Sequence, residues 1–352
     1  MTKTTRTKGS WLKGVTYFAS GSNHAGEIAG FAALGHAVGI TADKLNEAAL
    51  VATEATNGSV PVFVDSGAFG EVSFGDNGPV VVKPISDAQW KTRLALYSRL
   101  ADALGSALTV VAPDKVGFAD ETLGRLSRYR KQVQAIAAKG ATTLVPLQGA
   151  DKVDFWRKAQ LALNMTENDG LVPALPCKKN ATSIDDVVAF CAATQPRRVH
   201  LLGLGAPNKN ARRVVEGIRQ MSPDTEISLD SCLITASVGK TNGRANHAEE
   251  FRGCSRVLTA ATKSIDPAMK LATTERKRRA IIQAFVSQAI WSPHPGQPLV
   301  RGFSVTMRRA EPLPARTAEE KDRSAAWKDQ MSQWRAARST APTTPQQLTL
   351  AL

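Results

Sequence analysis

The sequence has few cysteines, and none of them is spaced like a metal ligand. The 352 residues include four, Cys177, Cys191, Cys232 and Cys254, and no two are separated by only two residues. The CxxC spacing that zinc ribbons and thioredoxin-type redox sites need is therefore missing. We expect core residues or free thiols in a reducing compartment, and neither a zinc site nor another cofactor.

Long apolar segments are also missing. No uninterrupted apolar run approaches the roughly 20 residues that a helix needs to cross a bilayer. Residues 1–13 form a basic tail, and no apolar core of the signal-peptide type follows it. These absences predict a soluble, cytoplasmic protein without a membrane partner.

Two nucleotide-binding motifs are absent as well. The first predicted strand is not followed by the glycine-rich turn that binds dinucleotides. Gly239-Lys240-Thr241 is similar to the end of a phosphate-binding loop, but Ile234 stands where that loop requires a glycine. The sequence therefore predicts neither a Walker motif nor a dinucleotide-binding turn.

What the sequence does have is positive charge and enough apolar residues for a core. The formal net charge is +14, and 43% of the residues are hydrophobic. The length suits one large α/β domain or two ordinary ones. A surface this basic attracts polyanions, above all nucleic acid, although the same charge can serve solubility alone.

Eight short segments rich in apolar and β-branched residues predict eight strands, mostly separated by predicted helices. The strands are expected at residues 15–20, 37–41, 60–65, 108–114, 142–148, 171–177, 199–205 and 226–230. This alternation predicts an α/β fold, a (β/α)8 barrel of TIM type that occupies residues 14–300. A doubly wound open sheet is the alternative, but it normally carries the dinucleotide turn that is missing here.

The segments between and after these strands are predicted as follows. Helices are expected at residues 27–34, 42–55, 86–104, 120–139, 151–163, 183–194, 208–221 and 273–290, with a glycine-rich loop at 69–82. The helix at 120–139 carries Arg125, Arg128, Arg130 and Lys131, which we expect on a solvated face. Residues 301–352 are predicted as a basic extension with a helix at 318–338 and a disordered end.

One stretch, SVPVFVDSGAFG at residues 59–70, combines a buried strand with a carboxylate at its end. A barrel brings the carboxyl ends of all its strands to one mouth. Other predicted strands also end in polar residues or glycines: Asp114, Gln148, Gly203, Gly205 and Asp230. Two carboxylates can divide the work of nucleophile and general base, while glutamine and a third acid can read the edge of a purine-like base.

The motifs DSGAF, VPLQG, LLGLGAP and LDSCLIT occur in that order from Asp65 to Thr235. Together they resemble the guanine transglycosylase superfamily, whose members are (β/α)8 barrels that exchange guanine for a 7-deazaguanine in nucleic acid. The resemblance covers roughly residues 59–240. It implies a pentosyltransferase, with Asp230 as the nucleophile that attacks C1′ and holds the sugar as an ester.

The same resemblance implies roles for the other strand-end residues. Asp65 would be the general base on the incoming base, while Asp114 and Gln148 would read the base edge. The turn at Ser66 and Gly67 and the backbone at Gly203 and Gly205 would contact the base, and Phe69 would pack near it. These implied substrate-binding residues are Ser66, Gly67, Phe69, Asp114, Gln148, Gly203 and Gly205.

Two departures favour DNA over tRNA as the substrate. The tRNA enzymes carry a cysteine-rich zinc site after the last strand, which this sequence lacks. The predicted strand LVPALPC also lacks the paired glycines that the family uses to recognise the base. The resemblance is closer to the DNA-modifying branch of phages and genomic islands, which inserts 7-deazaguanines such as 7-cyano-7-deazaguanine into DNA.

DNA also fits the charge, because basic residues neutralise phosphates. A guanine must leave the duplex to reach a barrel mouth, so helper proteins that open the duplex are partners to consider, as is a homodimer. We predict phosphate contacts from Lys240, Arg244, Arg276, Lys277, Arg278 and Arg279. The alternatives are the same chemistry on tRNA, a nucleic-acid-binding barrel without catalysis, and a sugar-processing hydrolase that uses the same two acids.

Overall fold

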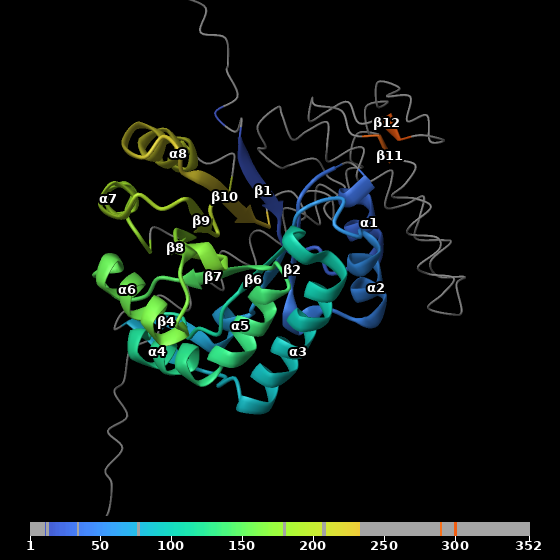
Figure 1. Ribbon diagram of the computed structural model, residues 1–352, viewed down its shortest axis with the longest axis horizontal. Coiled ribbons are helices and arrows are strands. Elements are labelled where there is room, and N and C mark those ends of the chain that lie inside the picture. Colours follow the sequence, from blue (N-terminus) through green and yellow to red (C-terminus); the bar gives the residue numbers. More distant parts are fainter. Residues whose placement is uncertain are drawn as a thin grey trace, which may run out of the picture. The chain divides into compact units, whose positions relative to one another are not determined.

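The computed structural model describes Trp11 and residues 14–33, 35–75, 78–178, 181–205, 209–232, 289–290 and 299–300 (Figure 1). The chain divides into two compact units, Met1–Val305 and Thr306–Leu352. The helix predicted at 318–338 and the disordered end lie outside the described residues, as does most of the helix predicted at 273–290. Its last two residues, Ala289–Ile290 (β11), instead pair antiparallel with Leu299–Val300 (β12), so the helix prediction is wrong there.

Eight parallel strands close into a barrel in the order β1-β10-β9-β8-β7-β6-β3-β2. The strands are β1 (Val15–Ala19), β2 (Val38–Thr41), β3 (Val62–Asp65), β6 (Leu108–Val111), β7 (Thr142–Pro146), β8 (Leu171–Pro176), β9 (Arg198–Leu202) and β10 (Glu226–Ser231). Each coincides with a predicted strand, so the α/β barrel fold of TIM type is confirmed. β1 pairs with β10 over its whole length, which closes the ring.

Helices cover the outside of the barrel, as Figure 1 shows. They are α1 (Ala25–Ala33), α2 (Glu47–Ala55), α3 (Asp87–Leu104), α4 (Ala119–Arg128), α5 (Arg130–Ala138), α6 (Lys152–Leu163), α7 (Ile184–Thr194) and α8 (Lys209–Met221). Local signals explain where they begin: Ser86 and Gln89 form a capping box at the start of α3, and the side chains of Asp151 and Ser183 cap α6 and α7.

The barrel has two apolar layers because its strands alternate between the two faces. The larger layer lies between the strands and the helices and includes Trp90, Tyr97 and Leu100 of α3. A smaller cluster fills the interior and consists of Phe18, Ala37, Phe63, Val111, Leu144, Val172 and Ala174. The interior is therefore a packed plug, on which the side chains at the carboxyl ends of the strands rest.

Two predictions between the strands are wrong. The predicted glycine-rich loop contains a hairpin of β4 (Val72–Gly75) and β5 (Gly78–Val81), because valines and Phe74 form pairs on either side of a short turn. The single helix predicted at 120–139 is divided into α4 and α5 at Tyr129, whose backbone is not helical (φ −101°, ψ 13°). The Tyr129 side chain is buried, and its hydroxyl donates to Asp87 at the start of α3.

Candidate active site at the carboxyl end of the barrel

Two aspartates end strands on different sides of the same mouth. Asp65 is the last residue of β3 and pairs with Thr41 at the end of β2. Asp230 lies near the end of β10 and pairs with Phe18 of β1. The charge of Asp230 contributes to a raised pKa of Asp65, so the two members of the predicted catalytic pair are close enough to share one site.

Asp230 is held by donors from its neighbouring strands. The Ser20 hydroxyl, just after β1, donates to Oδ2 at 3.0 Å. The Gly203 amide, just after β9, donates to Oδ1 at 2.6 Å. His200 Nε2 of β9 lies 3.3 Å from the same Oδ1. The carboxylate is therefore nearly buried, but fixed hydrogen-bond donors of the protein surround it. This arrangement keeps a nucleophile oriented.

Two glycines make these contacts sterically possible. Gly203 has φ +70°, a conformation that L side chains rarely adopt, and this turn directs its amide to Asp230. A Cβ on Gly39 of β2 would lie 2.4 Å from the Ser20 hydroxyl oxygen. Gly39 therefore provides the space that the Ser20 side chain needs beside Asp230. Gly203 was predicted as a base contact, whereas Gly39 was missed.

Asp65 has a different environment. Burial, followed by the charge of Asp230, raises its pKa to about 6, against the opposing effect of hydrogen bonds from the backbone amides of Gly67 and Ser66. Gly67 has φ +74°, and a Cβ there would lie 2.8 Å from an Asp43 carboxylate oxygen. Asp43 is thus a further acid beside this turn. A carboxyl with this pKa can carry a proton or release it near neutral pH.

Asp114 follows β6 and is linked to the same turn. The Ser66 hydroxyl donates to its Oδ1 at 3.1 Å. Burial, and then the charge of Asp65, raises the pKa of Asp114 to about 7. Ser66 therefore acts through its side chain, in addition to the backbone contact predicted for it. Neutral Asp114 would present a hydrogen-bond donor that an ionised carboxylate lacks.

Gln148 follows β7 and has one unused hydrogen-bonding group. Its Oε1 accepts from the Gly117 amide at 2.9 Å, which fixes the orientation of the side-chain amide. Its Nε2 is buried and has no hydrogen-bond partner among the described residues. Because leaving a buried donor unpaired is costly, this group is well suited to a ligand that supplies an acceptor.

A buried ion pair supports this side of the mouth. Arg125 of α4 makes two hydrogen bonds of 2.7 and 2.6 Å to Glu71, which is 1% exposed. The same guanidinium donates to the backbone carbonyl of Asp114 and lies over the Trp90 ring. The prediction of a solvated Arg125 is wrong, because helix periodicity does not reveal a buried glutamate before β4.

Exposed aromatic rings flank the mouth. Phe69 is 45% exposed and stacks on Phe74, which is 54% exposed, with ring centroids 5.7 Å apart. The Lys178 ammonium, just after β8, lies 4.0 Å from the centroid of the Phe69 ring. Because β7 and β6 lie between β8 and β3 in the barrel, this contact reaches across part of the mouth.

The structure thus gathers most of the predicted site residues. Contacts or electrostatic coupling link Asp65, Ser66, Gly67, Asp114 and Asp230 with Gly203, while Gly205 is buried without a described contact to them. The predicted phosphate-contacting residues Lys240, Arg244, Arg276, Lys277, Arg278 and Arg279 lie outside the described residues. His200 and Ser20 were missed; their inward register on predicted strands was the available signal.

Other properties of the described residues bear on cofactors and membranes. Among them, no group of three or more His, Cys, Asp or Glu side chains is arranged to hold a metal ion. Cys177, Cys191 and Cys232 are free, and burial raises the pKa of both Cys177 and Cys191 to about 12. No helix within the described segments is long and apolar enough to cross a membrane.

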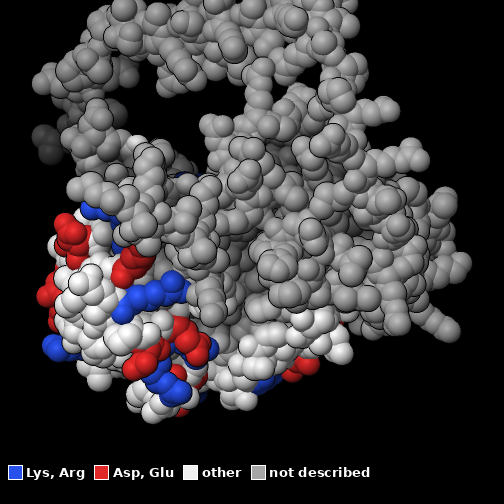
Figure 2. Space-filling view, turned by 90° about the horizontal axis from the view of Figure 1, so that it is seen from above, with Lys and Arg blue, Asp and Glu red and all other residues white. Residues whose placement is uncertain are grey.

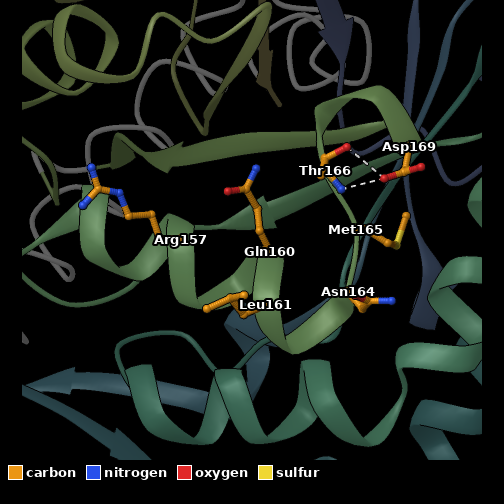
Figure 3. A pocket seen from close by; sticks show the side chains of 7 residues that line it. All are labelled: Arg157, Gln160, Leu161, Asn164, Met165, Thr166 and Asp169. Atoms are coloured by element: carbon orange, nitrogen blue, oxygen red, sulfur yellow. Dashed lines mark hydrogen bonds between the residues drawn. The ribbon is translucent and has the colours of Figure 1, made fainter.

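A hollow of about 580 Å³ lies at the opposite, amino end of the barrel, beside the turn between α6 and β8 (Figure 3). Asp169 there accepts hydrogen bonds from the amide and hydroxyl of Thr166, at 2.8 and 2.9 Å. Its lining is Arg157, Gln160, Leu161, Asn164, Met165, Thr166 and Asp169. The hydrogen bonds at this turn are ordinary capping interactions. The lining includes none of the acids of the mouth.

Comparison with known proteins leaves the family open. No family model matches the chain, and no curated protein matches it. Similar solved structures include a candidate fructose-1,6-biphosphate aldolase from Coccidioides immitis (11% identity, 77% of this chain and 94% of that one, TM-score 0.42). A KGPDC from Streptococcus mutans is also 11% identical (71% and 98%, TM-score 0.37), as is the 3-keto-D-glucoside 4-epimerase YcjR from E. coli (71% and 99%, TM-score 0.41). At this identity the likeness does not extend to substrate or reaction.

Proposed function

We propose that the protein is a DNA-guanine transglycosylase that exchanges guanine in DNA for a 7-deazaguanine, such as 7-cyano-7-deazaguanine. The observation that carries the proposal is the contrast between two carboxylates in one mouth. Asp230 receives donors from Ser20 and Gly203 and lies 3.3 Å from His200 Nε2, whereas the pKa of Asp65 is raised to about 6. Base exchange needs such a pair, one fixed nucleophile and one group that moves a proton.

In the first step, an Asp230 oxygen bonds to C1′ of the target nucleotide while the bond from C1′ to guanine N9 breaks. The electron pair of that bond remains on the departing guanine. Protonated Asp65 gives its proton to this base, which leaves neutral. The raised pKa of Asp65 makes this transfer feasible near neutral pH.

In the second step, the incoming 7-deazaguanine attacks C1′ through N9 and the bond from C1′ to Asp230 breaks. Ionised Asp65 takes the N9 proton, so both aspartates return to their starting state. No net proton, electron or external energy source is consumed, because one glycosidic bond is exchanged for another. Guanine and 7-deazaguanine can therefore use the same site in the two steps.

The base edge would be read by Asp114 and Gln148. Guanine and 7-deazaguanines share a carbonyl and an adjacent amide N–H and amino group. Gln148 Nε2, which has no partner within the described part of the chain, can donate to the carbonyl oxygen. Asp114, when ionised, can accept from the N–H and amino groups, and it has the Ser66 hydroxyl to orient it. Only guanine and 7-deazaguanines would pair with all of these buried groups. The site would therefore favour them over adenine, which would leave a buried donor unsatisfied.

DNA as the substrate is supported by the distribution of charge along the sequence. Residues 1–232 contain 26 Lys and Arg against 22 Asp and Glu, whereas residues 233–352 contain 19 against 9. On the described part of the face in Figure 2, acidic and basic side chains are intermixed. We therefore assign most of the phosphate neutralisation to the segment after β10, where Lys240, Arg244 and the cluster at 276–279 lie.

The test is an exchange assay on matched substrates. DNA and tRNA are separately loaded with labelled guanine, then incubated with the protein and 7-cyano-7-deazaguanine, and label release is followed. We expect release from DNA that Asp230→Ala abolishes and Asp65→Ala strongly reduces. Release from tRNA alone would replace DNA by tRNA as the substrate. Salt-sensitive DNA binding without release, with every 7-deazaguanine tried and with cell extract added, would reduce the protein to a binding barrel.

A further inference from the structure

His200 is a buried imidazole directly beneath Asp230. It has no exposed surface, and its ring stacks on Phe63 with centroids 5.2 Å apart, next to Phe18 at 6.0 Å. Its two nitrogens both have polar partners: Nδ1 lies 2.8 Å from the Ser228 hydroxyl, and Nε2 lies 3.3 Å from Asp230 Oδ1. The ring thus links the apolar plug of the barrel to the carboxylate of the mouth.

The partners determine where the imidazole proton sits. An ionised carboxylate can only accept, so Nε2 must carry a hydrogen to bond to Asp230 Oδ1. Nδ1 is then an acceptor, and the Ser228 hydroxyl donates to it. The other acceptor for that hydroxyl, the Val199 carbonyl, is farther away at 3.4 Å. Ser228 therefore selects the tautomer in which His200 donates to Asp230.

The two oxygens of Asp230 are consequently unequal. Oδ1 receives two donors, the Gly203 amide at 2.6 Å and His200. Oδ2 receives one donor from the described residues, the Ser20 hydroxyl at 3.0 Å. A carboxylate oxygen has two lone pairs in its plane, so Oδ2 keeps one free whereas Oδ1 does not.

We propose that His200 is a positioning residue for Asp230, which leaves Oδ2 as the oxygen that bonds to the sugar and Oδ1 as the carbonyl oxygen of the ester. This inference rests on the proposed base exchange. In the first step, Oδ2 forms the bond to C1′ as guanine leaves. In the second, that bond breaks, its electron pair returns to Oδ2, and the incoming base takes its place on C1′.

The donors on Oδ1 should act mainly on the second step. A hydrogen bond to an ionised carboxylate is stronger than one to a neutral carbonyl. His200 and Gly203 therefore stabilise the free carboxylate more than the ester, which makes Asp230 a better leaving group. Without His200, the sugar ester should accumulate during turnover.

The first experiment measures the hydrogen bond itself and needs no activity. Nitrogen-15 NMR of the full chain resolves the tautomers of its five histidines, and His200→Gln assigns the signal of interest. We expect the tautomer with the proton on Nε2, and a changed Nε2 signal in Asp230→Ala. A proton on Nδ1 alone, or no response to Asp230→Ala, would overturn the proposal.

The second experiment separates positioning from mere packing. His200→Phe keeps a ring against Phe63 but removes the donor, and His200→Gln supplies an amide donor. During base exchange we expect His200→Phe to lower turnover about 10-fold, the value of one hydrogen bond to a charged group, and to raise the fraction of protein trapped as the sugar ester by quenching. Because only the second step is slowed, kcat/KM for DNA should not fall, so KM for DNA should fall together with turnover. His200→Gln should recover part of the turnover.

The control is His36→Phe, a partly buried histidine that contacts Phe31 outside the mouth. Its ester fraction should equal that of the unsubstituted protein. If His200→Phe had the same turnover and ester fraction as the unsubstituted protein, the inference would be wrong. If the unsubstituted protein exchanged no base with any nucleic acid, the proposed function would fail, and the NMR result would still decide whether His200 donates to Asp230.

Discussion

Aspartate side chains have different surroundings on the two sides of the barrel mouth. On the Asp230 side, formed by β1, β9 and β10, the carboxylate receives the Ser20 hydroxyl and the Gly203 amide and lies 3.3 Å from His200 Nε2. On the Asp65 side, formed by β3 and β6, Asp65 and Asp114 are crowded together, and their pKa values rise to about 6 and about 7. Burial and the charges of neighbouring acids thus raise the pKa values of both acids on the Asp65 side, against the opposing effect of the donors that they receive.

We expect the largest effect from a substitution at Gly39, which disturbs the surroundings of Asp230. In Gly39→Ala the new Cβ would lie 2.4 Å from the Ser20 hydroxyl oxygen and 2.6 Å from the Ser20 Cα. Ser20 must move, so its bond to Asp230 Oδ2 is lost and the carboxylate shifts. We expect base exchange to fall at least about 100-fold, the usual result of misplacing a reacting group by an ångström, together with a lower thermal midpoint.

Two further variants serve as a milder change and as a control for that result. Ser20→Ala removes the hydroxyl without forcing the backbone apart, so it should cost only about 5- to 10-fold in exchange. Gly70→Ala places a Cβ in open space near the same mouth and should leave both exchange and the thermal midpoint unchanged. Equal activity of Gly39→Ala and Gly70→Ala would show that Ser20 does not hold Asp230.

On the Asp65 side, we expect a large loss of stability when the buried ion pair is removed. Arg125→Met leaves Glu71 buried without a counter-charge and removes a donor from the Asp114 carbonyl. We expect the free energy of unfolding to fall by about 3–5 kcal/mol, measured by urea denaturation near neutral pH. The matched control is Arg212→Met, which breaks an exposed pair with Glu216 and should change stability by less than about 0.5 kcal/mol.

The pH dependence of stability should reveal the raised pKa on the Asp65 side. Burial raises the pKa of Asp114 to about 7, above its value in the unfolded chain. The folded state therefore holds this proton more tightly, and ionisation costs stability as the pH rises from about 4 to about 7. Asp114→Asn should stabilise the fold by about 1–3 kcal/mol at pH 8, and this gain should vanish at pH 4.

Asp230→Asn is the opposing variant for this comparison. Its amide replaces a carboxylate that receives donors from Ser20 and Gly203, so it should destabilise the fold at pH 8. Thermal midpoints of both variants at pH 4 and pH 8 provide the measurement. Stabilisation of both to the same extent would mean that the two sides of the mouth do not differ.

The smallest effect is expected at the rim. Phe74 is 54% exposed and contacts the Phe69 ring, so it can stack on a base beside the flipped nucleotide. Phe74→Ala should raise KM for DNA about 5-fold, the low end for one base on an aromatic ring, while kcat stays unchanged. Leu161→Ala, at an exposed leucine by the amino-end hollow, should alter neither value in the same exchange assay.

Much of the fold could be predicted from the sequence. The eight strands follow from short apolar runs, since burial on both faces of a parallel sheet imposes that pattern on each strand separately. Asp65, Asp114, Gln148 and Asp230 could be placed at one mouth because parallel strands in a barrel present their carboxyl ends together. The hairpin of β4 and β5 was hidden by the glycines of its turn, which signal a loop as readily as a tight reversal.

What only the tertiary structure decided is how each acid is surrounded. Ser20 and Asp230 are 210 positions apart, and Glu71 and Arg125 are 54 apart; no local period links such residues. The closure of β1 on β10 places Ser20 beside Asp230, while the packing of α4 against the turn before β4 buries the ion pair. How firmly each carboxyl group holds a proton depends on donors and desolvation, and these exist only once the barrel has closed.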